Sequence, residues 1–124
     1  MIKNSFNVNK QCVIKILKYT DENKQVLQQG NIETAQDLER SLSPKYAVTQ
    51  LITNIYEVSK KLQPDILQSL TEFNRIKTRT ARQIASHDYV KVDFNIILNI
   101  CKNLTKDNVI AELNNFLKGN DNED

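Results

Sequence analysis

Apolar residues recur along this chain at helical spacing, and few residues interrupt the pattern. Only two glycines and two prolines occur among the 124 residues. Glycine and proline favour turns and interrupt helices, so their scarcity predicts long helices joined by short turns. A chain of this length buries one hydrophobic core and is too short for two. We therefore predict a single all-α domain.

The predicted architecture is an up-and-down bundle of four main helices with short extra helices. The predicted helical segments, in order, are about residues 7–28, 31–42, 43–62, 65–70, 74–86, a helix starting at 94 and a last helix ending at 117. One apolar face of the first helix is expected to hold Val8, Cys12, Ile16 and Tyr19. The residues predicted to cap helices are Gly30, Ser43 (with Pro44 in the first turn), Asp93, and either Thr105 or Asp107.

The formal net charge is +2, and acidic residues gather at the C-terminus. Asp121, Glu123 and Asp124 lie within the last six residues, so the rest of the chain is more basic than the total indicates. We expect one helical domain over residues 1–118 and an acidic disordered tail over residues 119–124. A mildly basic domain permits RNA binding without requiring it.

The two cysteines, Cys12 and Cys101, each lie on an apolar helical stripe and are predicted to be buried free thiols. With one histidine and two distant cysteines, the sequence contains no known metal-ligand spacing, so we expect no metal and no cofactor. No apolar run approaches the ~20 residues that span a membrane. Together with the lack of a secretory signal, these features predict a cytoplasmic protein with no membrane partner.

The segment Arg82-Gln83-Ile84-Ala85-Ser86-His87-Asp88-Tyr89 holds the only histidine of the chain. Histidine exchanges a proton near neutral pH, because its ordinary pKa is about 6.5. The guanidinium of Arg82 offers a planar fork of donors to a phosphate, and Tyr89 offers a stacking face and a hydroxyl. These groups suit a site that holds and cuts a nucleic-acid strand without a metal.

Further arginines precede this motif at helical spacing. Arg75 and Arg79 are four residues apart, and Arg79 and Arg82 are three apart, which places all of them on one helical face. Such a row suits a polyanionic backbone. Arg82 and His87 are five residues apart, so an unbroken helix would direct them about 140° apart. They converge only if the helix loosens near His87 or if two copies of the motif meet in a dimer.

The pattern Arg-x4-His-x-Tyr in a small helical chain resembles the HEPN domain (higher eukaryotes and prokaryotes nucleotide-binding). It is most similar to the HepT-type toxins of two-protein toxin–antitoxin pairs. The similarity covers roughly residues 45–101. Residues 46–62 resemble the family's second long helix, Phe73 lies near a position that is often tryptophan, and residues 89–93 followed by 96–98 are also typical of the family.

The resemblance implies an HEPN-like bundle that acts as a metal-independent endoribonuclease toxin in toxin–antitoxin or phage-defence systems. The 2′-hydroxyl of the RNA would attack the adjacent phosphate, His87 would act as acid or base, and Arg82 would stabilise the developing charge. Gln83, Arg79 and Arg75 would have supporting roles. The resemblance further implies a homodimer with the site between protomers, and a nucleotidyltransferase antitoxin that adds AMP to Tyr89.

Gln83 departs from the family pattern, which usually has asparagine or aspartate at this position. This departure favours an alternative, a catalytically inactive HEPN dimer that binds a nucleotidyltransferase partner or a nucleotide. A helical interaction module without any role in nucleic-acid binding is a third alternative.

Each motif residue also has a structural interpretation. His87 could end a helix by binding free carbonyl groups, and Arg82 could pair with a nearby carboxylate. Tyr89 could be a core tyrosine with a solvated hydroxyl. Arg75 and Arg79 could form an ordinary solvated face.

Overall fold

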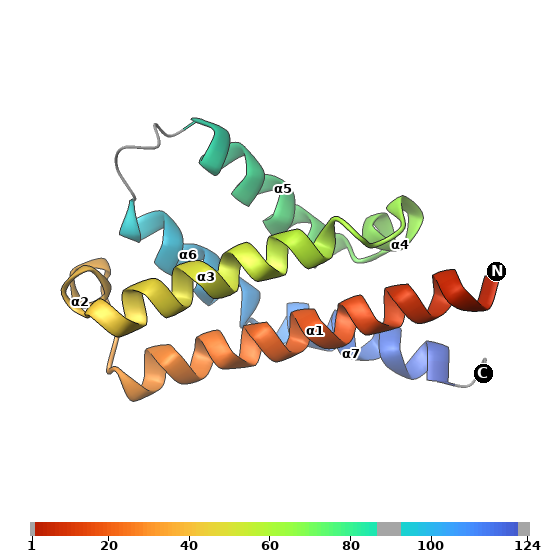
Figure 1. The fold of residues 1–124 in the computed structure, drawn as a ribbon, viewed down its shortest axis with the longest axis horizontal. Helices are drawn as coiled ribbons and strands as arrows, with labels where there is room; N and C mark the ends of the chain where they lie inside the picture. Colours follow the sequence, from red (N-terminus) through yellow and green to blue (C-terminus); the bar gives the residue numbers. More distant parts are fainter. Residues whose placement is uncertain (1, 87–92, 122–124) are drawn as a thin grey trace.

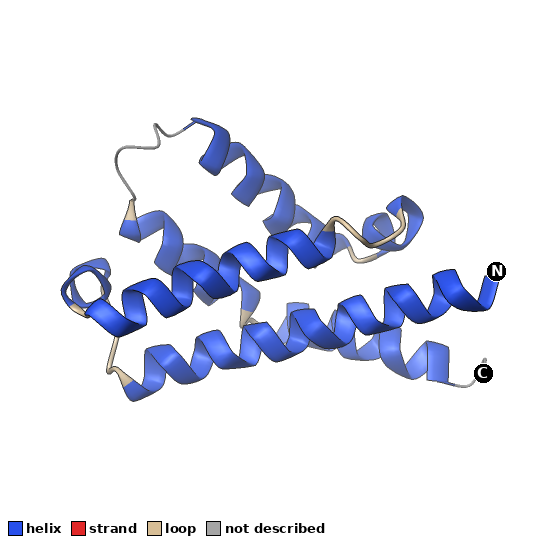
Figure 2. Ribbon diagram, viewed as in Figure 1, coloured by secondary structure: helices blue, strands red, loops and turns tan. Residues whose placement is uncertain are grey.

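The chain folds into a helical bundle, seen here in a computed structural model that describes residues 2–86 and 93–121. Every regular element within these ranges is an α-helix, so the all-α prediction is confirmed (Figure 2). The helices are α1 (Ile2–Gln29), α2 (Ala35–Arg40), α3 (Leu42–Ser59), α4 (Pro64–Ser69), α5 (Thr71–Ser86), α6 (Phe94–Leu104) and α7 (Asp107–Asp121).

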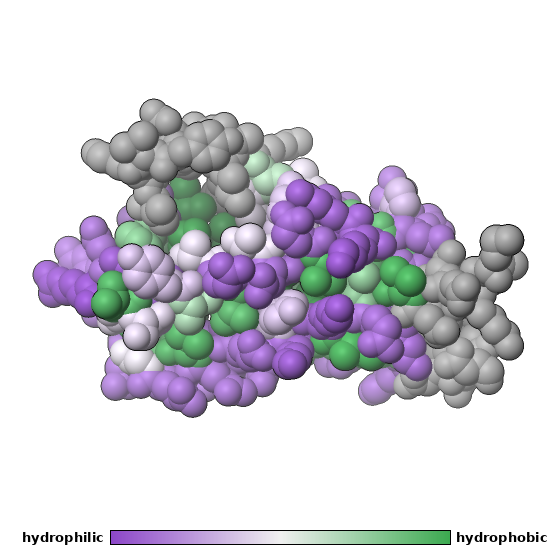
Figure 3. All heavy atoms as spheres, in the orientation of Figure 1, coloured by the Kyte–Doolittle hydropathy of each residue, from purple (hydrophilic) through white to green (hydrophobic). Residues whose placement is uncertain are grey.

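The longest packing contact of the bundle joins α1 and α3, which run side by side along the molecule (Figure 1). Helix α6 packs against both of them, and α7 packs against α1. Helix α5 rests on α6 and α7, and the short helix α4 joins it to the end of α3. In the space-filling view, hydrophilic residues dominate the edge along α1, and hydrophobic atoms show mainly between the helices (Figure 3).

The buried face of α1 differs from the predicted apolar face. Cys12 and Ile16 are buried as expected, but Val8 is 49% exposed. The neighbouring helices instead cover Val13 and the polar residue Asn9. Asn9 can be buried because its side chain is hydrogen-bonded. It donates to the Gln63 side chain at 2.9 Å and accepts from the Gln63 backbone N–H at 3.0 Å. The spacing of apolar residues in the sequence does not reveal a buried polar residue of this kind.

The side chains of two other polar residues of α1 face the core without any hydrogen bond to the described protein. Thr20 and Asn23 are 1% and 0% exposed, and neither the Thr20 hydroxyl nor the Asn23 amide has a partner there. A buried polar group without a partner costs about 1–3 kcal/mol.

We therefore expect Thr20→Val to raise the free energy of unfolding by about 1 kcal/mol, measured by urea denaturation. Thr80→Val is the matched control, because Thr80 is also buried and its hydroxyl donates to the carbonyl of Ile76 at 2.7 Å. That control should bring no comparable gain. A loss of stability in Thr20→Val would show that its hydroxyl is satisfied in solution.

Gly30 follows the last residue of α1, as predicted, but the left-handed backbone conformation falls on Asn31, whose φ is 54°. The N–H of Ile32 bonds to the carbonyl of Leu27 at 2.9 Å, and the N–H of Asn31 bonds to that of Gln28 at 3.2 Å. This is the Schellman pattern, in which asparagine can replace glycine. Gly30 is favoured instead by space, since a Cβ atom there would lie 3.2–3.3 Å from its neighbours.

The predicted start of α3 at Ser43 is wrong by two positions. The N-cap is Ser41, the helix begins at Leu42, and Pro44 lies within the first turn. Proline is tolerated there because the first N–H groups of a helix have no intrahelical acceptor. Ser41 also contacts the preceding helix, because its hydroxyl donates to the carbonyl of Asp37 at 2.8 Å. One residue thus ends α2 and begins α3.

Asp37 itself belongs to a capping box at the start of α2. Its carboxylate accepts from the backbone N–H groups of Glu33 and Thr34, while its own N–H donates to the Thr34 hydroxyl. The hydrogen bonds from Glu33 and Thr34 lower the pKa of Asp37 below its ordinary value. Helix α2 is short and has little apolar surface with which to pack. The capping box stabilises it by providing partners for backbone N–H groups at its start.

The last two helices confirm one predicted cap and correct another. Asp93 caps α6, accepting from the N–H of Asn95 at 2.9 Å. Thr105, however, ends α6, and its hydroxyl donates to the carbonyl of Cys101 at 3.2 Å. Asp107 is the first residue of α7 itself, so neither of the two predicted residues, Thr105 and Asp107, is the N-cap of α7.

Helix α7 also continues through Asp121, beyond the domain boundary predicted at residue 118. The expected tail of residues 119–124 is therefore helical over its first three positions. Once a helix is formed, each added residue gains one hydrogen bond, so a docked helix can extend through weak helix formers. Residues 122–124 lie outside the described part of the chain.

The two cysteines are buried free thiols, as predicted. Burial raises the pKa of Cys101 to about 12 and raises that of Cys12 above its ordinary value. Both thiols are therefore protonated and unreactive at neutral pH. None of the helices in the described ranges is long and apolar enough to cross a membrane.

Candidate functional site

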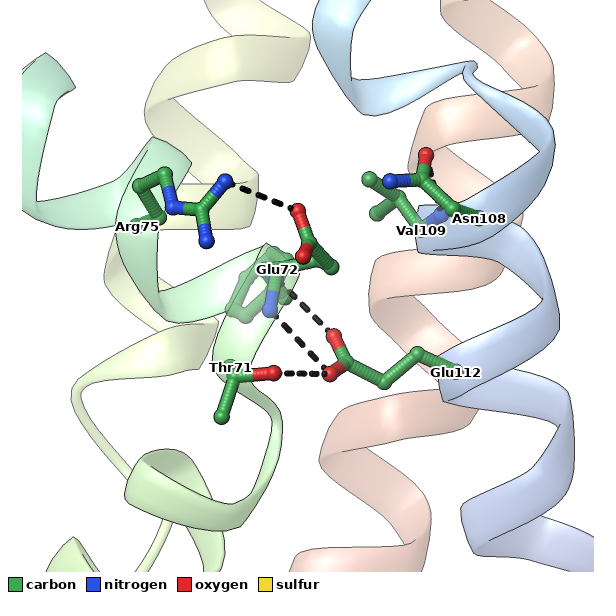
Figure 4. A network of polar contacts seen from close by, with 7 residues as sticks. Thr71, Glu72, Arg75, Asn108, Val109 and Glu112 are labelled. Carbon is green, nitrogen blue, oxygen red and sulfur yellow. Dashed lines mark hydrogen bonds and ion pairs between the residues drawn. The ribbon is translucent and has the colours of Figure 1, made fainter.

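Helix α5 carries the arginine row, and the first turn of this helix is anchored by a carboxylate from α7. Glu112 accepts hydrogen bonds from the backbone N–H groups of Glu72 and Phe73 at 3.1 and 2.9 Å (Figure 4). It also accepts from the Thr71 hydroxyl at 3.2 Å. These N–H groups are among those that a helix leaves free, and the positive end of the helix dipole favours the carboxylate. Glu112 thus fixes the start of α5 against α7.

We expect Glu112→Gln to lower the free energy of unfolding by about 1–3 kcal/mol in thermal or urea denaturation. The amide keeps the shape of the side chain but loses the charge, and its NH2 group cannot accept from a backbone N–H. Glu57→Gln is the control, because Glu57 forms an exposed ion pair with Lys60 at 3.3 Å. Exposed pairs contribute about 0–1 kcal/mol, so equal effects of the two changes would contradict the anchoring role.

The inner face of α5 packs into the core of the same chain. Phe73 is 1% exposed and Thr80 is 5% exposed, with the half-buried Ile76 between them. The predicted motif helix began at Asn74 and therefore left out Phe73. The observed helix begins at Thr71, so it includes Phe73, the largest fully buried side chain of the described residues.

A pocket of about 290 Å³ opens where α5 meets α6 and the start of α7. Its floor is apolar, formed by Ile76, Ile100 and Val109, of which the last two are 4% and 1% exposed. Its rim is polar, and in Figure 4 Arg75 on α5 and Asn108 on α7 face each other across the gap. The pocket is near the lower end of the ~300–1,000 Å³ range of small-molecule sites.

The rim of this pocket is rich in groups that donate hydrogen bonds. From α5 it includes Arg75, Arg79 and one acid, Glu72; the other rim residues are Asn99, Asn103, Lys106 and Asn108. The counted charges are three positive and one negative, so the formal charge of the lining is positive.

Among the described residues, one of the three cations is neutralised by an ion pair. Arg75 pairs with Glu72 at 3.2 Å, and this exposed pair is weak. Within the described ranges, neither Arg79 nor Lys106 forms an ion pair, and the side-chain amides of Asn99 and Asn103 have no hydrogen-bond partner. As far as the described residues go, the pocket therefore holds two unpaired cations beside unpaired amides, an arrangement that attracts anions with polar substituents.

The predicted site residues are only partly within the described side chains. Arg75 and Arg79 are exposed, as a solvated face requires, but they also line one pocket. Arg82 and Gln83 lie in α5, which is helical as far as Ser86. Their side chains, and His87 and Tyr89 altogether, lie outside the described residues.

The backbone of α5 relates the pocket to the motif. Position 82 is seven residues after Arg75 and three after Arg79, so all three fall on one face of the continuous helix. At 1.5 Å per residue, position 82 is about 4.5 Å along the axis from Arg79 and about 10.5 Å from Arg75. The arginine row thus leads from the pocket to the motif arginine.

Lys106 and the two asparagines of α6 were not predicted as site residues. The spacing of Asn99 and Asn103 is i,i+4, which places them on one face and could have been noticed in the sequence. Lys106 could not, because it joins α6 to α7 and reaches the pocket only through the packing of α5 on both helices.

The described residues contain no group of three or more His, Cys, Asp and Glu side chains that could hold a metal ion. Comparisons with protein-family models, with curated proteins and with solved structures found no match.

Proposed function

We propose that this protein is a metal-independent endoribonuclease that uses Arg82 and His87, as its motif resemblance to HEPN toxins implies. The observation that supports the proposal most is the arginine face of α5. It connects a pocket whose cations Arg79 and Lys106 have no ion pair with any described residue to position 82 of the motif, and His87 is the next residue in the sequence after the last residue of this helix. A single strand of RNA needs such a continuous track for its phosphates.

In the proposed reaction, the 2′-oxygen of a ribose forms a bond to the adjacent phosphorus and the bond from phosphorus to the 5′-oxygen breaks. The proton of the 2′-hydroxyl goes to a base, and the leaving 5′-oxygen receives a proton from an acid. His87 supplies one of these transfers, and Arg82 stabilises the charge on the non-bridging oxygens. The products are a 2′,3′-cyclic phosphate and a free 5′-hydroxyl.

The proposal includes a homodimer and a protein that controls it. Two motifs that meet in one cleft would supply a histidine for each proton transfer and would remove the 140° separation of Arg82 and His87. A nucleotidyltransferase antitoxin would silence the site by adding AMP to Tyr89. The adduct would bring negative charge and bulk to the place of the RNA phosphate.

The test is to incubate the purified protein with single-stranded RNA in EDTA and to analyse the fragment ends. Cleavage that survives EDTA and leaves 2′,3′-cyclic phosphate ends is expected. Activity that disappears with EDTA and returns with Mg²⁺ would overturn the histidine mechanism. A protomer-sized mass in light scattering at micromolar concentration would overturn the shared cleft.

Gln83 supports a second candidate, an inactive HEPN dimer that binds a nucleotidyltransferase or a nucleotide. Its side-chain amide is one methylene longer than that of the asparagine usual in the family. Gln83→Asn separates the two candidates. If the wild-type dimer does not cut RNA and the Gln83→Asn protein does, the chain is a binding protein that lost its catalytic arrangement at this position.

A further inference from the structure

The pocket between α5, α6 and α7 combines an apolar floor with donors that have no partner among the described residues, and these features select one kind of ligand. Arg79 and Lys106 are exposed cations without an ion pair in the described part of the chain. Helix α7 contributes Asn108 and Val109 to the lining of the pocket, and both lie in the first turn of this helix. The helix dipole favours negative charge at that end. An anion with a single phosphate suits these groups.

The remaining lining is suited to a flat polar ring more than to a bare ion. Ile100 and Val109 form a nearly fully buried floor on which an apolar face can rest. Asn99 and Asn103 lie beside it, and their side-chain amides have no hydrogen-bond partner in the described ranges. Asparagine amides bind the edges of nucleic-acid bases. A volume of about 290 Å³ limits the occupant to about one nucleotide.

The distance along α5 relates this occupant to the proposed cut. Position 82 is about 4.5–10.5 Å along the helix axis from the two pocket arginines. A stacked strand rises about 3.4 Å per nucleotide, so this distance corresponds to about one to three nucleotides.

From these observations we infer that the pocket is a nucleotide subsite for single-stranded RNA. A phosphate would lie on Arg79 and Lys106, a base would lie on the floor beside Asn103, and the strand would continue along α5 to the motif. The inference rests on the proposed function, because it names where that substrate is held one to three nucleotides from the cleaved bond.

The test measures binding separately from cleavage. A fluorescent single-stranded RNA of about 12 nucleotides is titrated in EDTA against His87→Ala protein, which is expected to bind without cutting; sites of this kind cover ~4–16 nucleotides. Arg79→Glu and Lys106→Glu, each added to His87→Ala, should weaken binding about tenfold or more, since a charged hydrogen bond is lost. Lys24→Glu is the matched control, because Lys24 is an exposed lysine of α1 outside the pocket. It should change binding less than twofold, roughly the effect of a distant surface charge.

Two further arms define the ligand. AMP should displace the RNA at a lower concentration than inorganic phosphate, and Asn103→Leu should remove this difference. Equal displacement by phosphate and AMP would overturn the base position, and displacement by neither would overturn the subsite. The salt dependence of binding should fall by about 0.7 in log–log slope for each lost phosphate contact.

The outcomes separate this inference from the proposed function. If RNA binds through Arg79 and Lys106 but the wild-type protein never cuts it, the nuclease proposal fails and the subsite stands. If the wild-type protein cuts RNA and the two pocket variants bind RNA as tightly as Lys24→Glu, the subsite fails and the nuclease proposal stands. Melting curves of the variants must match that of the control, so that a folding defect is excluded.

Discussion

Replacing His87 with alanine is expected to reduce the rate of RNA cleavage by about 10²–10⁴-fold, the usual contribution of a general acid or base. The imidazole is the one side chain of this sequence with an ordinary pKa near neutrality, so no other residue can take over its proton transfer. The measurement is single-turnover cleavage of a labelled RNA in EDTA, at protein concentrations well above that of the RNA.

Ser86→Ala is the adjacent control. The proposed mechanism gives the Ser86 hydroxyl no role in proton transfer or in phosphate binding. The control should cut RNA at close to the wild-type rate, while Arg82→Ala should lose cleavage because the charge on the phosphate is no longer stabilised. Undiminished cleavage by His87→Ala would end the proposed mechanism, because the activity would then come from other residues or from a contaminant.

Truncating Phe73 to alanine is expected to have the largest effect on stability, a loss of about 3–5 kcal/mol in the free energy of unfolding. Phe73 is 1% exposed, it belongs to the hydrophobic core cluster, and its backbone N–H bonds to Glu112. Removing the ring leaves a cavity at the place where the start of α5 is attached to the bundle. Urea denaturation followed by circular dichroism measures the effect.

Tyr46→Ala is the comparison for this change, because it removes a similar ring from a position that is 67% exposed. It should cost well under 1 kcal/mol, as surface substitutions usually do. Similar losses in both variants would mean that α5 is not attached through Phe73. Since domains of this size are stable by about 5–15 kcal/mol, Phe73→Ala can bring the protein close to unfolding at 37 °C. A drop in RNA binding by this variant at 37 °C but not at 15 °C would follow from the same cause.

Several elements could be predicted from local sequence because their causes are local. The scarcity of glycine and proline indicated the all-α class, and the stripe of Leu51, Ile55 and Val58 is buried in α3 as its spacing indicates. Asp93 caps α6 because a short carboxylate before an apolar helical run can reach the N–H of Asn95 without help from other segments. The arginine row of α5 is likewise a matter of helical spacing alone.

Helix ends were less predictable, because neighbouring elements compete for the same residues. Ser41, and not Ser43, is the N-cap of α3. The hydroxyl and the N–H of Ser41 also donate to carbonyl groups of α2, which places the start of α3 directly after the end of α2. Thr105 serves the end of α6, so it is not free to cap α7. Each of these segments contains several Ser, Thr or Asp residues that could cap a helix. Which of them does so depends on the hydrogen bonds that it also makes to the preceding helix.

The sequence by itself determined the helical class, the buried thiols and the charged face of one helix, because these follow from composition and periodicity. Only the tertiary structure decided which residues of other helices lie beside the arginine face of α5. Lys106 and Asn103 are distant from Arg79 in the chain, and they share a pocket with it because α5 packs across α6 and the start of α7. The anchoring of α5 by Glu112 is equally non-local, 39 residues from Phe73. Contacts of this kind depend on how whole helices pack, and no spacing within a single helix encodes them.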